Sequence, residues 1–283
     1  MQRSLWAKKK KLTEAIQRFG RLAVALSGGV DSAVLLAEAK ACLGNEVIAL
    51  TARSPIHPEQ ELADATKIAD QLGAPHFIVD THETEKTDFL ANTDRRCYIC
   101  KKLIFAQLKA LAAEKGFALL AHGANVDDLG DYRPGLQAAR EMGIAAPLID
   151  AGWCKEDIRR VARERGLFVW NKPPMACFAT RFPYGTPINL ERVGQIKRSE
   201  QVLADAGISG CRVRHHDRVA RIEAPLDRLP ALTDNPLRQR IVDQLRAIGF
   251  LHVCVDLEGY VSGSLNRGLK TGAGRTGIES DAD

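Results

Sequence analysis

The sequence predicts an α/β fold in which a parallel sheet is covered by helices, followed by a smaller α+β domain. Three observations support this prediction. Apolar runs of strand length at residues 21–26, 46–51, 76–80 and 117–121 alternate with helical patterns. The first run turns through two glycines directly into a helix. After a proline-rich break at residues 171–174, the order changes to a helix, two paired strands, a helix and a strand.

The helices of the first domain follow from the spacing of their apolar residues. Leu5, Leu12, Ile16 and Phe19 form one face of an N-terminal helix, and the lysines at 8–11 are interpreted as its solvated face. Further helices are expected at residues 33–43, 58–72, 101–115 and 155–165. Residues 147–149 and 168–170 complete this domain.

The second part of the chain predicts a small α+β domain. A helix is expected at 189–206, strands at 212–214 and 219–223, a helix at 236–248 and a strand at 252–257. We therefore expect a first domain at 1–172, a linker at 173–187 that carries Cys177, the small domain at 188–270, and a tail at 271–283. The Gly, Ser and Asp content of the tail predicts disorder.

Composition limits the class of protein. The 283 residues carry a net charge of +5, which fits an anionic small substrate or RNA without choosing between them. Seven cysteines without a signal-like apolar core indicate thiols that are free or bound to metal in a reducing compartment. We expect a cytoplasmic protein with no membrane segment, because no apolar run reaches membrane length.

The motif S-G-G-V-D-S at residues 27–32 predicts an anion site. A strand that turns through glycines into a helix leaves backbone N–H groups unpaired, and the helix dipole favours a phosphate there. Thr51, at the end of the next strand, is expected at the same edge of the sheet. The motif lacks the lysine of G-x-x-x-x-G-K-[ST] and is not G-x-G-x-x-G. It resembles the pyrophosphate loop of N-type ATP pyrophosphatases, with Asp31 as a Mg²⁺ ligand. The candidate ATP-binding residues are Ser27, Gly28, Gly29, Asp31, Ser32 and Thr51.

A second signal is the pair Cys97 and Cys100 at the start of a helix. Two cysteines at this spacing bind a metal or a cluster, form a redox pair, or remain unliganded. Cys177 offers a third ligand, and three thiolates leave one position of a metal or cluster open for an exogenous sulfide.

Several motifs together resemble the LarE family. They are R-R-C-Y-I-C-K at 95–101, G-A-N-V-D-D at 123–128, D-Y-R-P-G at 131–135, C-F-A-T-R-F-P-Y-G-T at 177–186 and G-Y-V-S-G-S at 259–264. Thr180 departs from the serine that is usual there, although it keeps a hydroxyl. The resemblance implies an adenine nucleotide α-hydrolase-like, Rossmann-like first domain. It also implies an ATP-dependent sulfur transferase that converts the carboxylates of a pyridinium mononucleotide to thiocarboxylates for the nickel-pincer nucleotide of lactate racemase.

The resemblance also implies roles for individual residues. Cys177 matches the sulfur-carrying cysteine, and the positively charged Arg181 lies four residues on. Arg212 and Arg214 share one strand face and suit the phosphate of the mononucleotide, with Glu200 to orient one of them; a solvated face is the alternative. Gly123, Asn125 and Asp128 belong to a family motif at the nucleotide site. The implied cofactors are ATP, Mg²⁺ and a 4Fe–4S cluster on Cys97, Cys100 and Cys177, in a trimer-based homo-oligomer.

Other interpretations remain open at this stage. In some LarE proteins the cysteine matched by Cys177 gives up its own sulfur, whereas the three-cysteine pattern favours a cluster. A tRNA thiolase shares the loop and, in some groups, the cysteines, but no RNA-binding appendage is found, so nucleic acid is not expected as a partner. An amide-forming synthetase has no use for the three cysteines. A nucleotide-binding sensor without catalysis is the alternative from another class.

Overall fold

The computed structural model describes residues 2–130, 133–261 and 263–268, and it divides into two compact units, 1–197 and 198–283. The segment 173–187 belongs to the first unit, and the predicted tail at 271–283 lies outside the described residues. In the described part of the chain, no helix has both the length and the apolar character needed to cross a membrane.

The first unit is built on a parallel sheet of order β3-β2-β1-β4. Its strands are β1 (Leu22–Ala25), β2 (Val47–Arg53), β3 (His76–Asp80) and β4 (Leu120–His122). A single bridge between Ala121 and Ala145 extends the sheet beyond β4. The strands are apolar because helices cover both of their faces, as expected for parallel sheets. The predicted α/β class is therefore confirmed.

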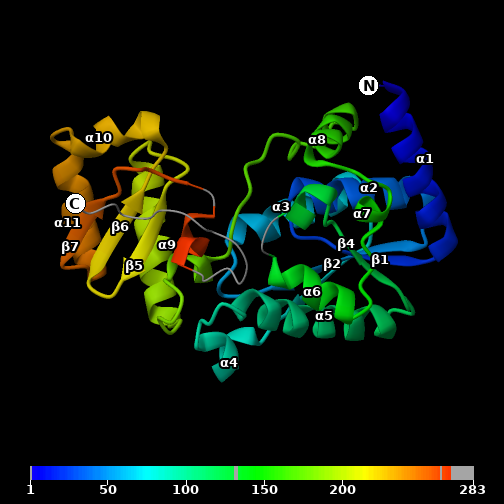
Figure 1. Cartoon of the computed structure of the whole chain (residues 1–283), viewed down its shortest axis with the longest axis horizontal. Helices are drawn as coiled ribbons and strands as arrows, with labels where there is room; N and C mark the ends of the chain where they lie inside the picture. Colours follow the sequence, from blue (N-terminus) through cyan, green and yellow to red (C-terminus); the bar gives the residue numbers. More distant parts are fainter. Residues whose placement is uncertain (1, 131–132, 262, 269–283) are drawn as a thin grey trace, which may run out of the picture. The chain divides into compact units, whose positions relative to one another are not determined.

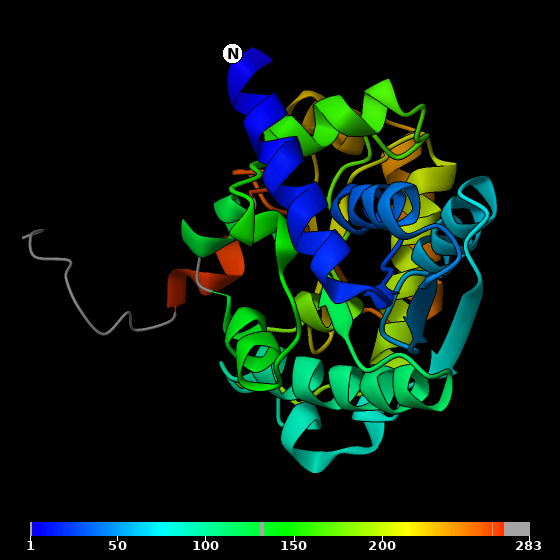
Figure 2. The same ribbon diagram turned by 90° about the vertical axis from the view of Figure 1, so that its right-hand side faces the viewer.

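Two layers of helix enclose this sheet, and the two main cores lie between the layers and the sheet (Figure 1). One layer holds α1 (Gln2–Phe19), α2 (Val30–Leu43), α3 (Glu59–Gln71), α7 (Pro147–Asp150) and α8 (Lys155–Glu164). The other holds α4 (Thr87–Leu90), α5 (Arg96–Glu114) and α6 (Pro134–Glu141). Figure 2 shows α1 and α5 on opposite sides. In α1, Leu5, Leu12 and Ile16 are buried, as the spacing predicts.

Two boundaries differ from the predicted ones. The strand predicted from residue 117 begins at Leu120, because the Phe117 N–H completes the end of α5 by donating to the Ala112 carbonyl over 2.8 Å. The helix predicted from residue 101 begins at Arg96, whose buried side chain donates to Asn92 and to the Ala179 carbonyl. Both cysteines of the pair therefore lie inside the helix. Residues 147–149 are helical, and residues 168–170 form a turn.

The second unit has a sheet of order β5-β6-β7, in which β5 (Arg212–His216) and β6 (Val219–Glu223) are antiparallel and β7 (His252–Val255) is parallel to β6. Its helices are α10 (Leu229–Thr233), α11 (Leu237–Ile248) and the C-terminal part of α9 (Leu190–Asp205). Short 3₁₀ turns occur along the chain at Glu83–Glu85, Val126–Gly130, Phe178–Arg181, Leu226–Arg228 and Ser264–Gly268. The elements confirm the predicted mixture of helix and paired strands.

Candidate active site

The loop between β1 and α2 has the form of an anion site. The Ser32 hydroxyl closes it by donating to the Gly29 carbonyl over 3.1 Å and by accepting from the Ser27 N–H over 3.2 Å. Gly28 has φ +75°, and a Cβ there would lie 2.2 Å from the Glu61 carbonyl oxygen of α3. A Cβ on Gly123, after β4, would lie 2.6 Å from the Ser32 nitrogen. Glycine is therefore required at both positions for the backbone segments to meet.

Asp31, in the first turn of α2, is surrounded by polar groups from two other segments. The Lys155 ammonium lies 2.5 Å from its carboxylate, and the Asn125 amide donates over 3.4 Å. Asp128 accepts from the Asn125 N–H over 3.0 Å and pairs with Arg133 at 2.7 Å. The structure thus brings together Asp31, Gly123, Asn125 and Asp128, all of which were predicted, with Lys155, which was not.

A second lysine that the sequence did not indicate contacts the loop at Gly28. Lys172 donates to the Gly28 carbonyl over 3.0 Å and pairs with the Asp64 carboxylate of α3. Both side chains are largely buried, at 14% and 10% exposed. Thr51 is also buried, and its hydroxyl donates to the Leu26 carbonyl at 2.7 Å and contacts His76. A role of Thr51 in binding ATP stays a prediction.

Glu61, one turn before Asp64 on α3, lies between the loop and the segment that carries Cys177. Its backbone carbonyl is the atom that faces Gly28. Burial raises the pKa of its carboxyl from 4.5 to about 7, against the opposing effects of Lys172, Lys101 and Arg181. Because all three cations act on one carboxyl, α3 connects the loop with the cysteine region.

The three cysteines of the predicted cluster come within electrostatic reach of one another. Cys97 and Cys100 lie in the first turns of α5, and Cys177 directly precedes the turn Phe178–Arg181. Burial raises the pKa of the Cys100 thiol, and the neighbouring Cys177 raises it further. Burial also raises the pKa of Cys177, and there Cys97 adds to the effect. Within the described ranges, no three His, Cys, Asp or Glu side chains are spaced to hold a single metal ion.

Two buried guanidinium groups accompany Cys177. Burial is the largest effect on the pKa of this thiol, and it raises the pKa. Arg96 and Arg181 act in the opposite direction, and each lowers the pKa. Arg181 donates to the Ala176 carbonyl at 3.0 Å and to the Thr180 hydroxyl at 2.9 Å. Arg96 reaches the same turn through the Ala179 carbonyl at 3.1 Å. Cation side chains favour the thiolate form, which is the nucleophilic and metal-binding form of cysteine.

In the second unit, the predicted arginines lie on a densely charged strand pair. Arg214 pairs with Glu223 at 2.6 Å, and the two side chains are 7% and 2% exposed. Arg212 lies over the Tyr260 ring at 5.1 Å, and Glu200 accepts from the Val213 N–H at 3.0 Å. Glu223, which the sequence did not indicate, therefore shares the buried face with Arg214.

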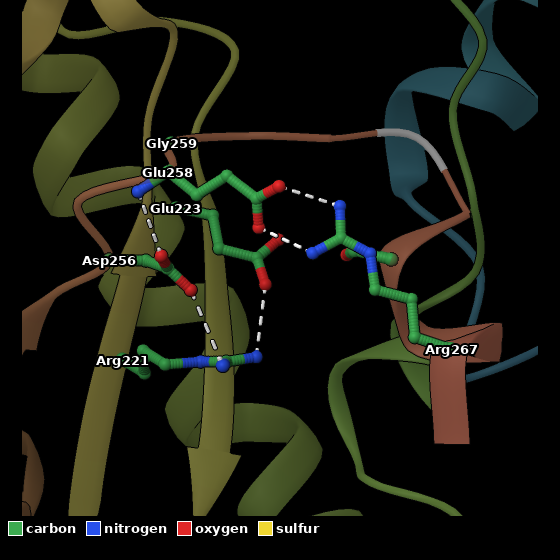
Figure 3. Close-up of a pocket in the computed structure, with 7 residues that line it drawn as sticks. Arg221, Glu223, Asp256, Glu258, Gly259 and Arg267 are labelled. Carbon is green, nitrogen blue, oxygen red and sulfur yellow. Dashed lines mark hydrogen bonds and ion pairs between the residues drawn. The ribbon is translucent and has the colours of Figure 1, made fainter. Parts of the chain in front are cut away.

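Beside this pair lies a polar cavity of about 150 Å³ (Figure 3). Arg221 bridges Glu223 at 3.1 Å and Asp256 at 3.3 Å, and Arg267 binds Glu258 at 2.5 Å. The cavity thus holds charges of both signs in ion pairs.

Comparisons with known proteins identify relatives of the chain. Residues 10–111 match the asparagine synthase family. The chain is 39% identical over 262 residues to an uncharacterized protein of Synechocystis, covering 92% of this chain and 98% of the relative. It is 35% identical over 270 residues to pyridinium-3,5-bisthiocarboxylic acid mononucleotide synthase of Lactiplantibacillus plantarum, covering 93% of this chain and 95% of the relative. It is 30% identical to the tRNA-specific 2-thiouridylase MnmA of Rhodospirillum rubrum, over 70% of this chain and 62% of that protein.

The parallel sheet and the glycine loop at the start of α2 define a protein of the PP-loop ATP pyrophosphatase class, which uses ATP. The match with the Lactiplantibacillus synthase extends over nearly the whole of both chains. The chain therefore belongs to the LarE family, and it is an ATP-dependent sulfurtransferase.

Proposed function

We propose that this enzyme adenylates the carboxylates of a pyridinium dicarboxylate mononucleotide and replaces them with thiocarboxylates, in the synthesis of the nickel-pincer cofactor of lactate racemase. The observation that carries the proposal is the position of Glu61. Its carbonyl lies against Gly28 of the loop, and its carboxyl lies in the field of Arg181 beside Cys177. A nucleotide on the loop and a sulfur at the cysteines would therefore meet near the same turn of α3.

In the first step, a substrate carboxylate oxygen attacks the α-phosphorus of ATP, and pyrophosphate leaves with the electron pair of the broken P–O bond. The loop N–H groups and the hydroxyls of Ser27 and Ser32 bind the departing phosphates, for which the Ser32 hydroxyl turns away from the Gly29 carbonyl. Asp31 would hold Mg²⁺, which neutralises phosphate charge when it is bound. Asp31 fits such an ion, because it already binds the Lys155 ammonium at 2.5 Å.

In the second step, sulfur attacks the activated carbonyl carbon, and AMP leaves with the original carboxylate oxygen. Cys97, Cys100 and Cys177 would hold a 4Fe–4S cluster, which supplies the sulfur through a sulfide at its open position. The residues fit such a group, because Cys177 and Cys97 both raise the pKa of Cys100, Cys97 raises that of Cys177, and Arg96 and Arg181 stabilise thiolate charge at Cys177.

The mononucleotide phosphate is assigned to Arg212 and Arg214 of the second unit, with Glu200 close to their strand. A cytoplasmic location and a trimer-based homo-oligomer belong to the same proposal. Light scattering from the full chain measures the assembly directly.

Pyrophosphate release in the presence of ATP, Mg²⁺ and the pyridinium mononucleotide tests the adenylation step. We expect Asp31→Asn to abolish release, because metal and phosphate charge would lack their partner, and Glu156→Gln, an exposed residue of α8, to leave it unchanged. Full release by the Asp31 variant would contradict the role of Asp31. No release by the unmodified enzyme, with release when tRNA is added instead, would favour the thiouridylase activity of the MnmA relatives.

The sulfur source is tested on protein purified without oxygen. We expect iron and brown colour in the unmodified protein, and loss of both in the alanine variants of Cys97, Cys100 and Cys177, while pyrophosphate release persists. Dehydroalanine at position 177 after one turnover, with Cys97→Ala still active, would instead assign the sulfur to Cys177 itself.

A further inference from the structure

The pyrophosphate loop binds a strongly anionic group but carries no basic residue of its own. Residues 27–32 contain only the acidic Asp31, which adds a negative charge to the site. In this respect the loop differs from a P-loop, whose lysine lies in the motif itself. The structure brings Lys172 to the loop from 144 residues further along the chain.

We propose that Lys172 is a second cation of this loop, besides the Lys155 that pairs with Asp31, and that its ammonium binds the β- and γ-phosphates of ATP and the pyrophosphate that leaves. An ammonium has three N–H donors. Among the described residues, Gly28 and Asp64 take up two of them. The third is available to a phosphate oxygen, at the point where Gly28 turns the loop.

Lys172 is held in this position before any nucleotide arrives. Arg159 of α8 donates to the Asn171 side chain at 3.1 Å and to the Lys172 carbonyl at 3.3 Å. Asp64 fixes the other end of the lysine from α3. A charge that is already oriented needs no reorganisation when pyrophosphate forms, and such charges stabilise a leaving group most effectively.

The surrounding charges favour an anion over a closed ion pair. Lys172, Lys101 and Arg181 all act on Glu61, as does the carboxylate of Asp64, and Glu83 acts together with Lys101 on His57 and Cys100. Because the pKa of Glu61 is raised to about 7, this carboxyl is largely neutral in mildly acidic solution. Three cations then face two carboxylates, those of Asp64 and Glu83, so the cluster retains positive charge for the phosphates.

The inference rests on the proposed adenylation, but pyrophosphate binding can be measured without turnover. Calorimetry with inorganic pyrophosphate and, separately, with AMP is applied to the full chain with Mg²⁺. We expect Lys172→Gln, which keeps a donor for Gly28, to weaken pyrophosphate binding by about tenfold or more, and AMP binding by less than about twofold. The matched control is Lys67→Gln, because Lys67 is exposed on α3, the helix that carries Asp64, and lies over the Phe168 ring. It is expected to change neither affinity.

Unchanged pyrophosphate binding in folded Lys172→Gln, or equal losses for both ligands, would overturn the proposal. If that variant does not fold, ¹³C-methylated protein provides a second measurement, since methylated lysine keeps its charge. The Lys172 signal, identified by its absence from Lys172→Arg, should shift with pyrophosphate and not with AMP; an unmoved signal overturns the proposal. A wrong proposed function would give a different result. The unmodified enzyme would then show no turnover with the pyridinium mononucleotide, whereas Lys172→Gln would still weaken pyrophosphate binding more than AMP binding.

Discussion

At Gly28 the chain has room for a hydrogen atom and nothing larger. We expect Gly28→Ala to lower the free energy of unfolding by about 2–4 kcal/mol, because a Cβ adds left-handed strain and a clash with the Glu61 carbonyl. Gly73→Ala is the control: its φ is +57° and nothing lies within 4 Å of its Cβ. It has only the strain, so urea denaturation should show a smaller loss. Equal losses would mean that the loop moves away from α3 without cost.

The carboxyl of Glu61 should make stability depend on pH. Its pKa is raised by burial from 4.5 to about 7, so the folded state holds a proton that the unfolded state releases. The stabilisation from this group is therefore complete below pH 4.5, is lost as the pH rises to about 7, and stays lost above that.

We expect the stability difference between wild type and Glu61→Gln to fall across this window in denaturation series at several pH values. Taking the difference cancels the opposing effects of His57 and His122, whose pKa values are lowered to about 4 by burial. Glu59→Gln, exposed on the same helix, provides the control and should show no such slope. A pH-independent difference would place the Glu61 carboxylate in solvent.

The loop residues could be predicted because six consecutive residues carry the signal. Lys155 and Lys172 could not, because each meets its partner only through the fold, 124 and 144 residues away from Asp31 and Gly28. A lysine in sequence looks the same whether it is solvated or buried against a carboxylate. Glu223 was missed for the same reason.

At the scale of elements, the paired strands β5 and β6 depend on a buried charge. Glu223 is 2% exposed and accepts from Arg214 and Arg221 on the same strand pair. We expect Glu223→Gln to destabilise the protein by about 3 kcal/mol, because two guanidinium groups lose their carboxylate. Glu258→Gln, whose pair with Arg267 is half exposed, should have a much smaller effect. Thermal unfolding compares the two variants, and equal shifts would contradict this argument.

The limits of an element could be predicted where apolar periodicity determines them. They were harder to predict where side-chain contacts determine them. The strand His76–Asp80 was predicted with its observed limits. The cysteine pair was placed at a helix start, but the predicted range 101–115 missed the first turn of α5, where buried Arg96 begins the helix through its contacts. The cysteines consequently lie on a rigid helix, which fixes two of the three thiols relative to each other.

At the scale of the whole molecule, the two compact units carry different parts of the proposed chemistry. The loop, Asp31, Lys172 and the three cysteines all belong to the first unit. Arg212 and Arg214 belong to the second. Periodicity and a proline-rich break predicted that the chain changes architecture. A sequence pattern does not show which segments contact each other. The pattern therefore gave no reason to include residues 173–187 in the first unit.

This division predicts that the two substrates respond separately to substitution. Arg212→Ala should weaken binding of the pyridinium mononucleotide by about tenfold or more, because a charge-assisted bond to phosphate is lost, and should leave ATP binding unchanged. Arg212 is the better position for the test, because Arg214 is also part of the buried pair with Glu223 and its removal would destabilise the strands.

Calorimetry with each ligand measures the two affinities, and Arg218→Ala, exposed at the turn between β5 and β6, is the matched control. Loss of a surface charge alone weakens both anionic ligands slightly and equally, and this effect disappears with added salt. A direct contact instead weakens one ligand strongly and persists at high salt. Equal weakening of ATP and mononucleotide by Arg212→Ala would therefore assign Arg212 to the general field of the molecule and move the phosphate site elsewhere.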